Sequence, residues 1–84
     1  MFAYTYVLLC ADQDLYVGST DDLKRRIKQH QVGQVPSTSR RLPVELIYFE
    51  GCLSLAMARE RERQLKSGYG RQYLNRRLKL EPSA

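Results

Sequence analysis

The sequence predicts a small α+β domain in which helices flank a three-stranded sheet, antiparallel or mixed. Two segments rich in β-forming residues are separated only by the polar cluster ADQD, and a third such segment follows a proline. Segments with helical spacing come after the second and third of these. A chain of 84 residues that is 43% apolar supports one hydrophobic core. The expected order is β-β-α-β-α with an added C-terminal helix, and the helices pack on the sheet.

The first two strands form a predicted hairpin. The segment YTYVLLC predicts a strand over residues 4–10, and LYVG predicts a second over 15–18. The intervening ADQD is typical of a turn between antiparallel strands.

A helix is expected directly after this hairpin, over residues 21–31. Ser19 or Thr20 is a suitable N-cap, and the two aspartates that follow favour the positive end of the helix dipole. Gly33 marks the end of the helical pattern.

The second half of the chain repeats this alternation. GQVPSTSRRLP predicts a loop over 33–43, and VELIYFE predicts a third strand over 44–50, ended by a glycine. Ser54 is suited to cap a second helix over 55–67.

The last predicted elements are short. Gly68-Tyr69-Gly70 predicts a turn, and RQYLNRRLKL predicts a third helix. We assign residues 1–84 to a single domain, with a core over 4–79 and a short tail over 80–84. The N-terminal apolar run is too short for a membrane span and lacks a basic start, so we expect a cytoplasmic protein without a membrane partner.

Basic residues are concentrated in two windows that contain no acid. The formal net charge is +5, and the windows extend from Lys24 to Arg41 and from Arg63 to Lys79. Such windows suit a polyanion, because each neutralised phosphate releases counterions. A solvated basic surface is the alternative explanation. The residues assigned to nucleic-acid contacts are Lys24, Arg25, Lys28, Arg40, Arg41, Arg63, Lys66, Arg71, Arg76 and Arg77.

Two charged or titratable side chains of the first helix have unusual positions. At about 100° per residue, Arg26 and His30 fall within about 60° of Leu23, on the margin of the apolar face. The other basic residues of this helix fall on the solvent side. A histidine in this position is either a satisfied packing residue or part of a functional site.

Glu62 is the corresponding exception on the second helix. Helical spacing places it between Leu55 and Ala58, inside the apolar stripe, whereas Glu60 falls on the exposed side. An unpaired ionised acid in such a place is costly. Glu62 therefore either pairs with an arginine to fix the packing, or acts as a metal ligand or a base at the sheet edge.

Tyrosines supply a third group of candidates. Tyr6 and Tyr16 would share one face of the hairpin, close to the start of the first helix, although tyrosine is also an ordinary strand residue. Gly18 would then serve a tight strand-to-helix turn or the close approach of another group.

The set of two phenols, an arginine, a histidine and one carboxylate suits phosphodiester cleavage better than acyl transfer. The sequence contains no Ser-His-acid set, no glycine-rich phosphate loop and no His/Cys metal spacing. One carboxylate, together with water and substrate phosphate, is an ordinary environment for Mg²⁺.

These residues resemble the motifs of the GIY-YIG nucleases, especially the small stand-alone members. YVG at 16–18 matches the YIG motif, and YTY at 4–6 stands where GIY is usual, with its last tyrosine kept. The helix motif is matched by Leu23, Arg26 and His30, and a later motif by Arg61, Glu62, Leu65 and Lys66. The resemblance extends from residue 4 to about 79.

The resemblance implies the GIY-YIG fold and Mg²⁺-dependent endonuclease chemistry, with Mn²⁺ as another usable cation. It implies that Glu62 binds the metal and that Arg26 neutralises the scissile phosphate. Tyr6 and Tyr16 would flank the attacking water, one of them as general base. His30 would support the phosphate or a tyrosine hydroxyl.

The expected substrate is DNA in a repair or recombination context. A domain this small leaves little surface for reading bases, so we expect structure-preferring or weakly sequence-specific cutting. For the same reason we expect a protein partner or a homodimer to help the domain engage a duplex. Two alternatives stay open: a non-catalytic nucleic-acid binder with the same fold, and a protein-interaction module. Metal-dependent cleavage separates the enzyme from the binder, and steep salt dependence separates both from the interaction module.

Overall fold

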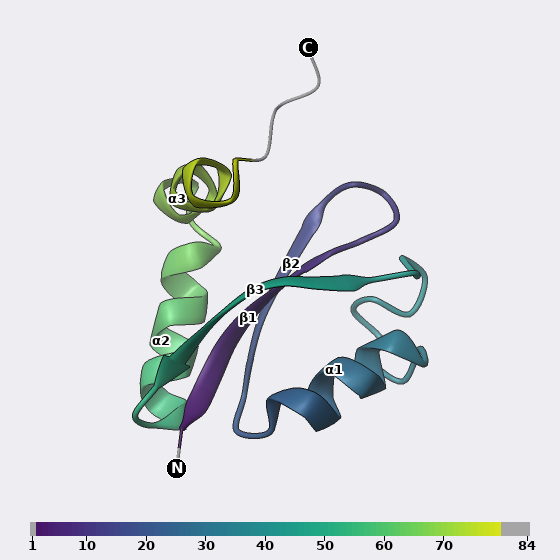
Figure 1. Cartoon of the computed structure of the whole chain (residues 1–84), viewed down its shortest axis with the longest axis horizontal. Helices are drawn as coiled ribbons and strands as arrows, with labels where there is room; N and C mark the ends of the chain where they lie inside the picture. The colour runs from purple at the N-terminus through teal and green to yellow at the C-terminus, as the bar shows by residue number, and fades with distance from the viewer. Residues whose placement is uncertain (1, 80–84) are drawn as a thin grey trace.

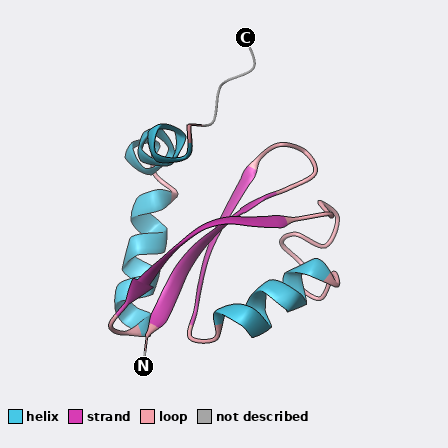
Figure 2. Cartoon of the chain, viewed as in Figure 1, coloured by secondary structure: helices cyan, strands magenta, loops and turns pink. Residues whose placement is uncertain are grey.

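The computed structural model describes residues 2–79 and shows the predicted order of strands and helices (Figures 1 and 2). The elements are β1 (Ala3–Leu9), β2 (Leu15–Thr20), α1 (Leu23–Gln31), β3 (Glu45–Cys52), α2 (Leu55–Leu65) and α3 (Gly68–Leu78). The predicted tail and the last residue of the predicted third helix lie outside the described residues. No helix within 2–79 has the length and apolar character needed to cross a membrane.

The sheet is antiparallel, with β1 between β2 and β3. Tyr6 of β1 stands opposite Gly18 of β2 and Phe49 of β3. An irregularity in the β1–β3 pairing lies between Val7 and Leu8. Because β1 is paired on both sides, its residues 5–8 are buried, and the two outer strands form the edges of the sheet.

Helices cover both faces of this sheet, as Figure 1 shows with α1 on one side and α2 and α3 on the other. Alternation along β1 divides the apolar residues between the two faces. Tyr6 and Leu8 pack with Ile27 of α1, whereas Val7 packs with Leu65 of α2 and Leu74 of α3. The domain therefore has two small cores, one on each side of the sheet.

The start of α1 differs from the prediction. Asp22 is the N-cap and accepts a hydrogen bond from the backbone N–H of Arg25, whereas Ser19 and Thr20 belong to β2. The Thr20 hydroxyl instead accepts from the Asp22 backbone N–H at 3.0 Å and closes the turn between strand and helix. The predicted cap of α2 is confirmed, because Ser54 Oγ accepts from the Met57 N–H.

The predicted turn at Gly68–Gly70 is wrong, because these residues form the first turn of α3. Ser67 caps the helix by accepting from the Gly70 N–H. Gly70 is buried against the backbone of Leu65, and a Cβ at Gly70 would clash with the Leu65 carbonyl group. The absence of a side chain at Gly70 therefore permits close contact between α2 and α3, and Gly70 does not end a helix.

Candidate active site

A buried hydrogen bond joins β1 to α1. Tyr6 is 1% exposed, and its hydroxyl lies 2.8 Å from Nε2 of His30, whose side chain is fully buried. The ring of Tyr16 lies 5.1 Å from the His30 ring and 6.4 Å from the Tyr6 ring, measured between centroids. The hairpin thus brings the two predicted tyrosines and the histidine onto one face of the sheet.

Gly18 makes room for this arrangement. It stands directly opposite Tyr6, and a Cβ on Gly18 would clash with the Tyr6 hydroxyl. Of the two reasons expected for a glycine here, close approach of another group is the one that applies. Gly18 lies inside β2, not in the turn after it.

Thr38 completes the hydrogen bonding of His30. It lies in the segment between α1 and β3, is fully buried, and its Oγ1 is 2.7 Å from His30 Nδ1. Sequence reasoning missed this residue, because Thr38 stands between two serines and nothing in its type or spacing distinguishes it from them. Both ring nitrogens of His30 are therefore engaged by hydroxyl groups.

Burial and the nearby Arg26 guanidinium lower the pKa of His30 to about 4. The imidazole is therefore neutral near pH 7, with one nitrogen as donor and the other as acceptor. With the proton on Nδ1, the ring donates to Thr38 and accepts from Tyr6. With the proton on Nε2, the ring donates to the Tyr6 oxygen. The chain of three side chains can thus give Tyr6 either an acceptor or a donor.

Arg26 is half-buried on α1, one turn before His30, and its Nη1 donates to Gln29 Oε1 at 3.1 Å. Burial raises the pKa of Tyr6, and the Arg26 guanidinium beside its hydroxyl acts in the opposite direction. The prediction that the other basic residues of α1 face solvent is confirmed, since Lys24, Arg25 and Lys28 are exposed.

Glu62 lies on the opposite face of the sheet, held at the β2 edge. Its Oε1 accepts from Ser19 Oγ at 2.6 Å, and its Oε2 accepts from Lys66 Nζ at 2.6 Å. The side chain is 22% exposed, in keeping with its place in the helical pattern. Of the two alternatives, pairing with an arginine is wrong, because the cation is the lysine one turn along the helix. Ser19 is a second partner that sequence reasoning missed.

The five predicted catalytic side chains therefore form two groups separated by β2. Ser19 follows Gly18 directly, so the carboxylate and the Tyr6 hydroxyl approach the same strand from its two faces. Burial is the main cause of the raised pKa of Tyr6, and the charge of Glu62 acts weakly in the same direction. Glu62 also lines a hollow of about 400 Å³ together with Arg59, Arg63 and Lys66.

A divalent cation would find oxygen ligands here, but not a preformed cage. No group of three or more His, Cys, Asp or Glu side chains suited to a metal occurs within residues 2–79. The Glu62 carboxylate and the Ser19 hydroxyl are hard oxygen donors, and Mg²⁺ commonly binds one or two carboxylates, several waters and substrate phosphate. Glu62, with Ser19 beside it, would therefore suit a hydrated Mg²⁺ bound together with substrate phosphate.

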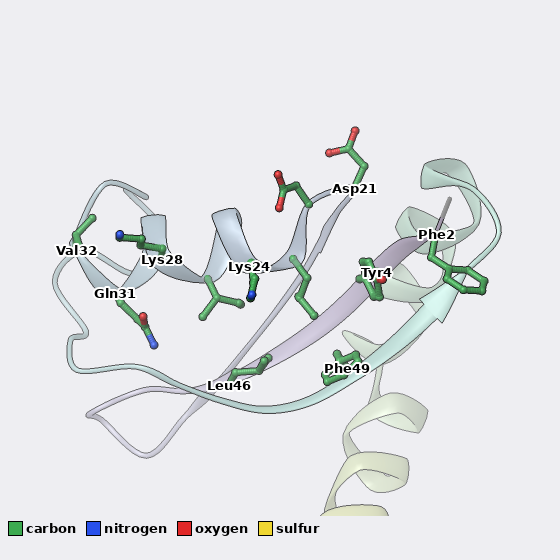
Figure 3. Close-up of a pocket in the computed structure, with 12 residues that line it drawn as sticks. Phe2, Tyr4, Asp21, Lys24, Lys28, Gln31, Val32, Leu46 and Phe49 are labelled. Carbon is green, nitrogen blue, oxygen red and sulfur yellow. The ribbon is translucent and has the colours of Figure 1, made fainter.

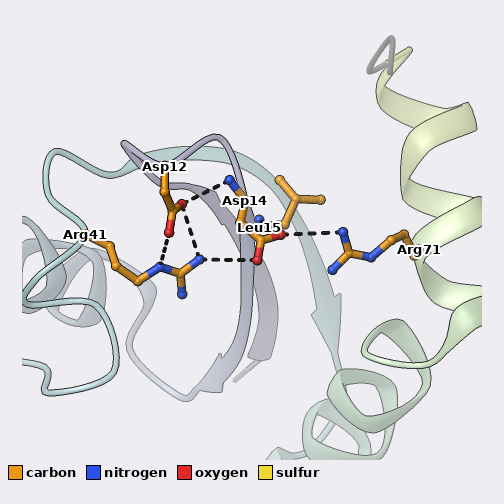
Figure 4. A network of polar contacts seen from close by, with 5 residues as sticks. All are labelled: Asp12, Asp14, Leu15, Arg41 and Arg71. Carbon is orange, nitrogen blue, oxygen red and sulfur yellow. Dashed lines mark hydrogen bonds and ion pairs between the residues drawn. The ribbon is translucent and has the colours of Figure 1, made fainter. Parts of the chain in front are cut away.

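Acidic residues of the β1–β2 hairpin hold two of the basic residues assigned to nucleic acid. Arg41 lies 2.9 Å from Asp12 and 3.7 Å from Asp14, and Arg71 of α3 reaches Asp14 at 3.4 Å (Figure 4). These acids lie outside the two acid-free windows and reach them only through folding. Arg41 and Arg71 are thus less available to phosphates than the sequence suggests.

The other assigned basic residues differ in their surroundings. Arg63 pairs with Glu60 on the exposed side of α2, and Lys66 pairs with Glu62. Arg40 is exposed, and Arg76 and Arg77 lie exposed near the end of α3.

A groove of about 800 Å³ lies between α1 and the sheet (Figure 3). Exposed Phe2 and Phe49 line one end, and Lys24 and Lys28 of α1 line the other side. None of the predicted catalytic residues lines this groove, so its size does not identify it as the active site.

The chain is similar to one known domain family and to several of its small proteins. A family model described as the GIY-YIG catalytic domain matches residues 2–77. A UPF0213 protein of Streptococcus agalactiae is 41% identical over 81 residues, which cover 87% of this chain and 92% of the relative. A UPF0213 protein of Natronomonas pharaonis is 43% identical over 65 residues, or 76% of each chain. The solution NMR structure of a UPF0213 protein from Bacillus halodurans aligns with a TM-score of 0.54 at 34% identity, covering 88% of this chain and 82% of that one. The chain therefore belongs to the GIY-YIG family, as one of its small UPF0213-type proteins.

Proposed function

We propose that this protein is an endonuclease that hydrolyses phosphodiester bonds in DNA with the help of Mg²⁺ or another divalent cation such as Mn²⁺. The family is a nuclease superfamily, which supports phosphodiester chemistry. The single observation that carries the proposal is the buried 2.8 Å contact between Tyr6 and His30, beside the Arg26 guanidinium. Such a phenol has both a proton partner and a cation next to it.

The substrate phosphate would lie at the β2 edge, between the two groups of side chains. Arg26 is half-buried and bound to a neutral side chain, so it is free to turn toward an anion. A fixed guanidinium is most effective where charge gathers on the phosphoryl oxygens in the transition state. Tyr6 is 1% exposed, and we propose that the same movement of Arg26 opens a path for water to its hydroxyl.

Tyr6 is the phenol we assign as general base. The oxygen of the attacking water bonds to phosphorus as the water gives a proton to the Tyr6 oxygen and the Tyr6 proton passes to His30 Nε2. The bond from phosphorus to the leaving oxygen breaks, and the leaving oxygen takes a proton from solvent. The negative charge of a phosphate beside Arg26 favours the protonated ring during this step. Tyr16, half-exposed and packed on His30, is assigned to positioning.

Glu62 is the residue that would hold the cation, with Ser19 fixing the carboxylate orientation. When bound, the cation supplies positive charge at the phosphoryl and leaving oxygens. Lys66, released from the carboxylate, would remain near enough to contact a neighbouring phosphate.

We further propose structure-preferring or weakly sequence-specific cutting of DNA, at branches, flaps or nicks, in repair or recombination. The support is the size of the domain. The exposed basic side chains on α1 and near the end of α3 contact a backbone rather than base edges in this proposal.

The test is cleavage of end-labelled linear, nicked, flapped and branched DNA at low salt, with Mg²⁺ or with EDTA. Three proteins are compared: wild type, Glu62→Gln, and Glu60→Gln as a matched change at an exposed carboxylate of the same helix. We expect wild type and Glu60→Gln to cut only with metal, and Glu62→Gln to bind without cutting. Binding by all three without cleavage would instead favour a non-catalytic nucleic-acid binder.

A further inference from the structure

A basic, aromatic hollow lies on α3, away from the candidate active site. It has a volume of about 440 Å³ and is lined by Tyr69, Tyr73, Arg76, Arg77 and Lys79. All the lining residues are tyrosine, arginine or lysine, and none is acidic. The proposed catalytic chemistry uses none of them.

The two tyrosines form a stacked pair one helical turn apart. Their ring centroids are 6.4 Å apart and their planes are inclined by 27°. Tyr69 is 65% exposed, so its ring is accessible to a ligand. The buried residues of α3 are Gly70 and Leu74, so the packing of this helix does not require an aromatic side chain at position 69.

Contacts with Tyr48 and Arg61 fix the ring of Tyr73. The Tyr73 hydroxyl lies 3.1 Å from the Tyr48 hydroxyl, and the Arg61 guanidinium carbon lies 5.0 Å from the Tyr73 ring centroid. Arg61 is itself paired with Glu50 at 2.9 Å. Tyr69 thus stacks on a ring whose position is already set, which lowers the entropy cost of adding another ring.

The charge of the hollow is suited to phosphate. Arg76 and Arg77 lie about two turns after Tyr69 on the same helix, and the structure gives neither an ion-pair partner among residues 2–79. Exposed aromatic rings next to arginines are the usual surface for single-stranded nucleic acid, where bases stack and phosphates meet cations.

We propose that this hollow binds an unpaired nucleotide segment, with a base stacked on Tyr69 and the flanking phosphates on Arg76 and Arg77. The proposal rests on the proposed function for its choice of nucleic acid as ligand. It deepens that function by assigning recognition of the single-stranded part of a flap or overhang to this surface of α3. A base inside a duplex has both faces covered by its neighbours, whereas the bases of an unpaired strand are open to stacking on Tyr69.

The test measures binding in EDTA, so cleavage does not enter it. Fluorescence anisotropy compares a blunt DNA duplex with the same duplex carrying a single-stranded overhang, using the full chain. Tyr69→Ala should weaken overhang binding by about tenfold and leave blunt-duplex binding unchanged, since base–aromatic stacking contributes on this order. Tyr69→Phe, which keeps the ring, and Gln72→Ala, an exposed change on the same helix, should both bind as wild type.

A second comparison tests the role of the two arginines. The Arg76→Gln/Arg77→Gln variant should weaken binding to both oligonucleotides and lower the salt slope by about two, one for each phosphate that is no longer neutralised. Equal binding of the overhang by Tyr69→Ala and wild type would overturn the inference. The same result is expected if α3 binds a protein instead of a nucleic acid. Overhang-selective binding by a protein that never cuts would uphold the inference and contradict only the endonuclease proposal.

Discussion

The two faces of the sheet handle charge differently. On the α1 face, Tyr6, His30 and Thr38 form a buried chain of neutral groups joined at 2.8 and 2.7 Å. On the α2 face, Glu62 is an ionised group shared between Ser19 and Lys66 and open to solvent at its margin. A dry, neutral chain suits proton transfer, and a wet carboxylate suits a hydrated cation. The difference suggests that β2 separates two tasks that one reaction needs together.

Removing the phenol of Tyr6 should have the largest effect. Tyr6→Phe deletes the proposed base and should lower the single-turnover cleavage rate by about 100-fold or more, as loss of a general base does. Tyr16→Phe is the matched change and should cost far less, because Tyr16 makes no hydrogen bond to His30 within residues 2–79 and contacts it through its ring. A larger loss for Tyr16→Phe would transfer the role of base to Tyr16.

Lowering the pH should lower the free energy of unfolding, because His30 is buried as a neutral ring on the α1 face. The folded protein holds this imidazole at a pKa of about 4, whereas the unfolded chain takes up a proton near pH 6.5. Between these values only the unfolded chain binds the proton, so stability falls as pH falls, by about 3 kcal/mol in all. Urea unfolding from pH 7 to pH 4 measures the loss, and His30→Asn should remove this part of it.

The single histidine of the chain also permits a direct check. Its imidazole resonances need no assignment among histidines, and NMR titration should give a pKa well below 6. A value near 6.5 would show that the ring is not buried as described.

Thr38→Val should test the far end of the neutral chain. It leaves His30 Nδ1 buried without a partner, at a cost of roughly 1–3 kcal/mol in the free energy of unfolding. Thr38→Ser keeps the hydroxyl and should recover most of the loss. A free energy of unfolding that is unchanged in Thr38→Val would contradict the assigned hydrogen bond.

Removing the ion pair between Arg61 and Glu50 should change the free energy of unfolding least. Unlike the loss of the His30–Thr38 hydrogen bond, this effect should depend on salt. The two side chains are each 23% exposed, and Arg61 holds the pKa of Glu50 below its usual range. Glu50→Gln should cost less than about 1 kcal/mol, since such pairs are screened by solvent. Added salt should weaken the wild type toward the variant, but should not change the cost of Thr38→Val.

Helical and strand periodicity predicted much of this arrangement. Spacing alone placed Arg26, His30 and Glu62 toward the sheet, and alternation placed Tyr6 and Tyr16 on one face. These residues lie on regular elements, where sequence number determines direction.

The hydroxyl partners could not be found in this way. Thr38 lies in a loop whose path depends on tertiary packing. The sequence predicts Ser19 or Thr20 as a helix cap, whereas Ser19 is a strand residue that faces α2. The start of α3 was missed for a related reason. Gly70 resembles a breaker in sequence, but it serves the close contact with Leu65 that only the folded chain reveals.

If the two faces of the sheet serve one reaction, as we claim, the effects of changing Tyr6 and Glu62 should be coupled in a double-mutant cycle. Single-turnover cleavage of a flapped DNA would be measured for wild type, Tyr6→Phe, Glu62→Gln and the double variant. We expect each single change to abolish most of the rate and the double variant to be hardly slower than either, because residues that act as a unit are not additive. A double variant whose loss equals the product of the two single losses would contradict the claim, as would full activity in Glu62→Gln.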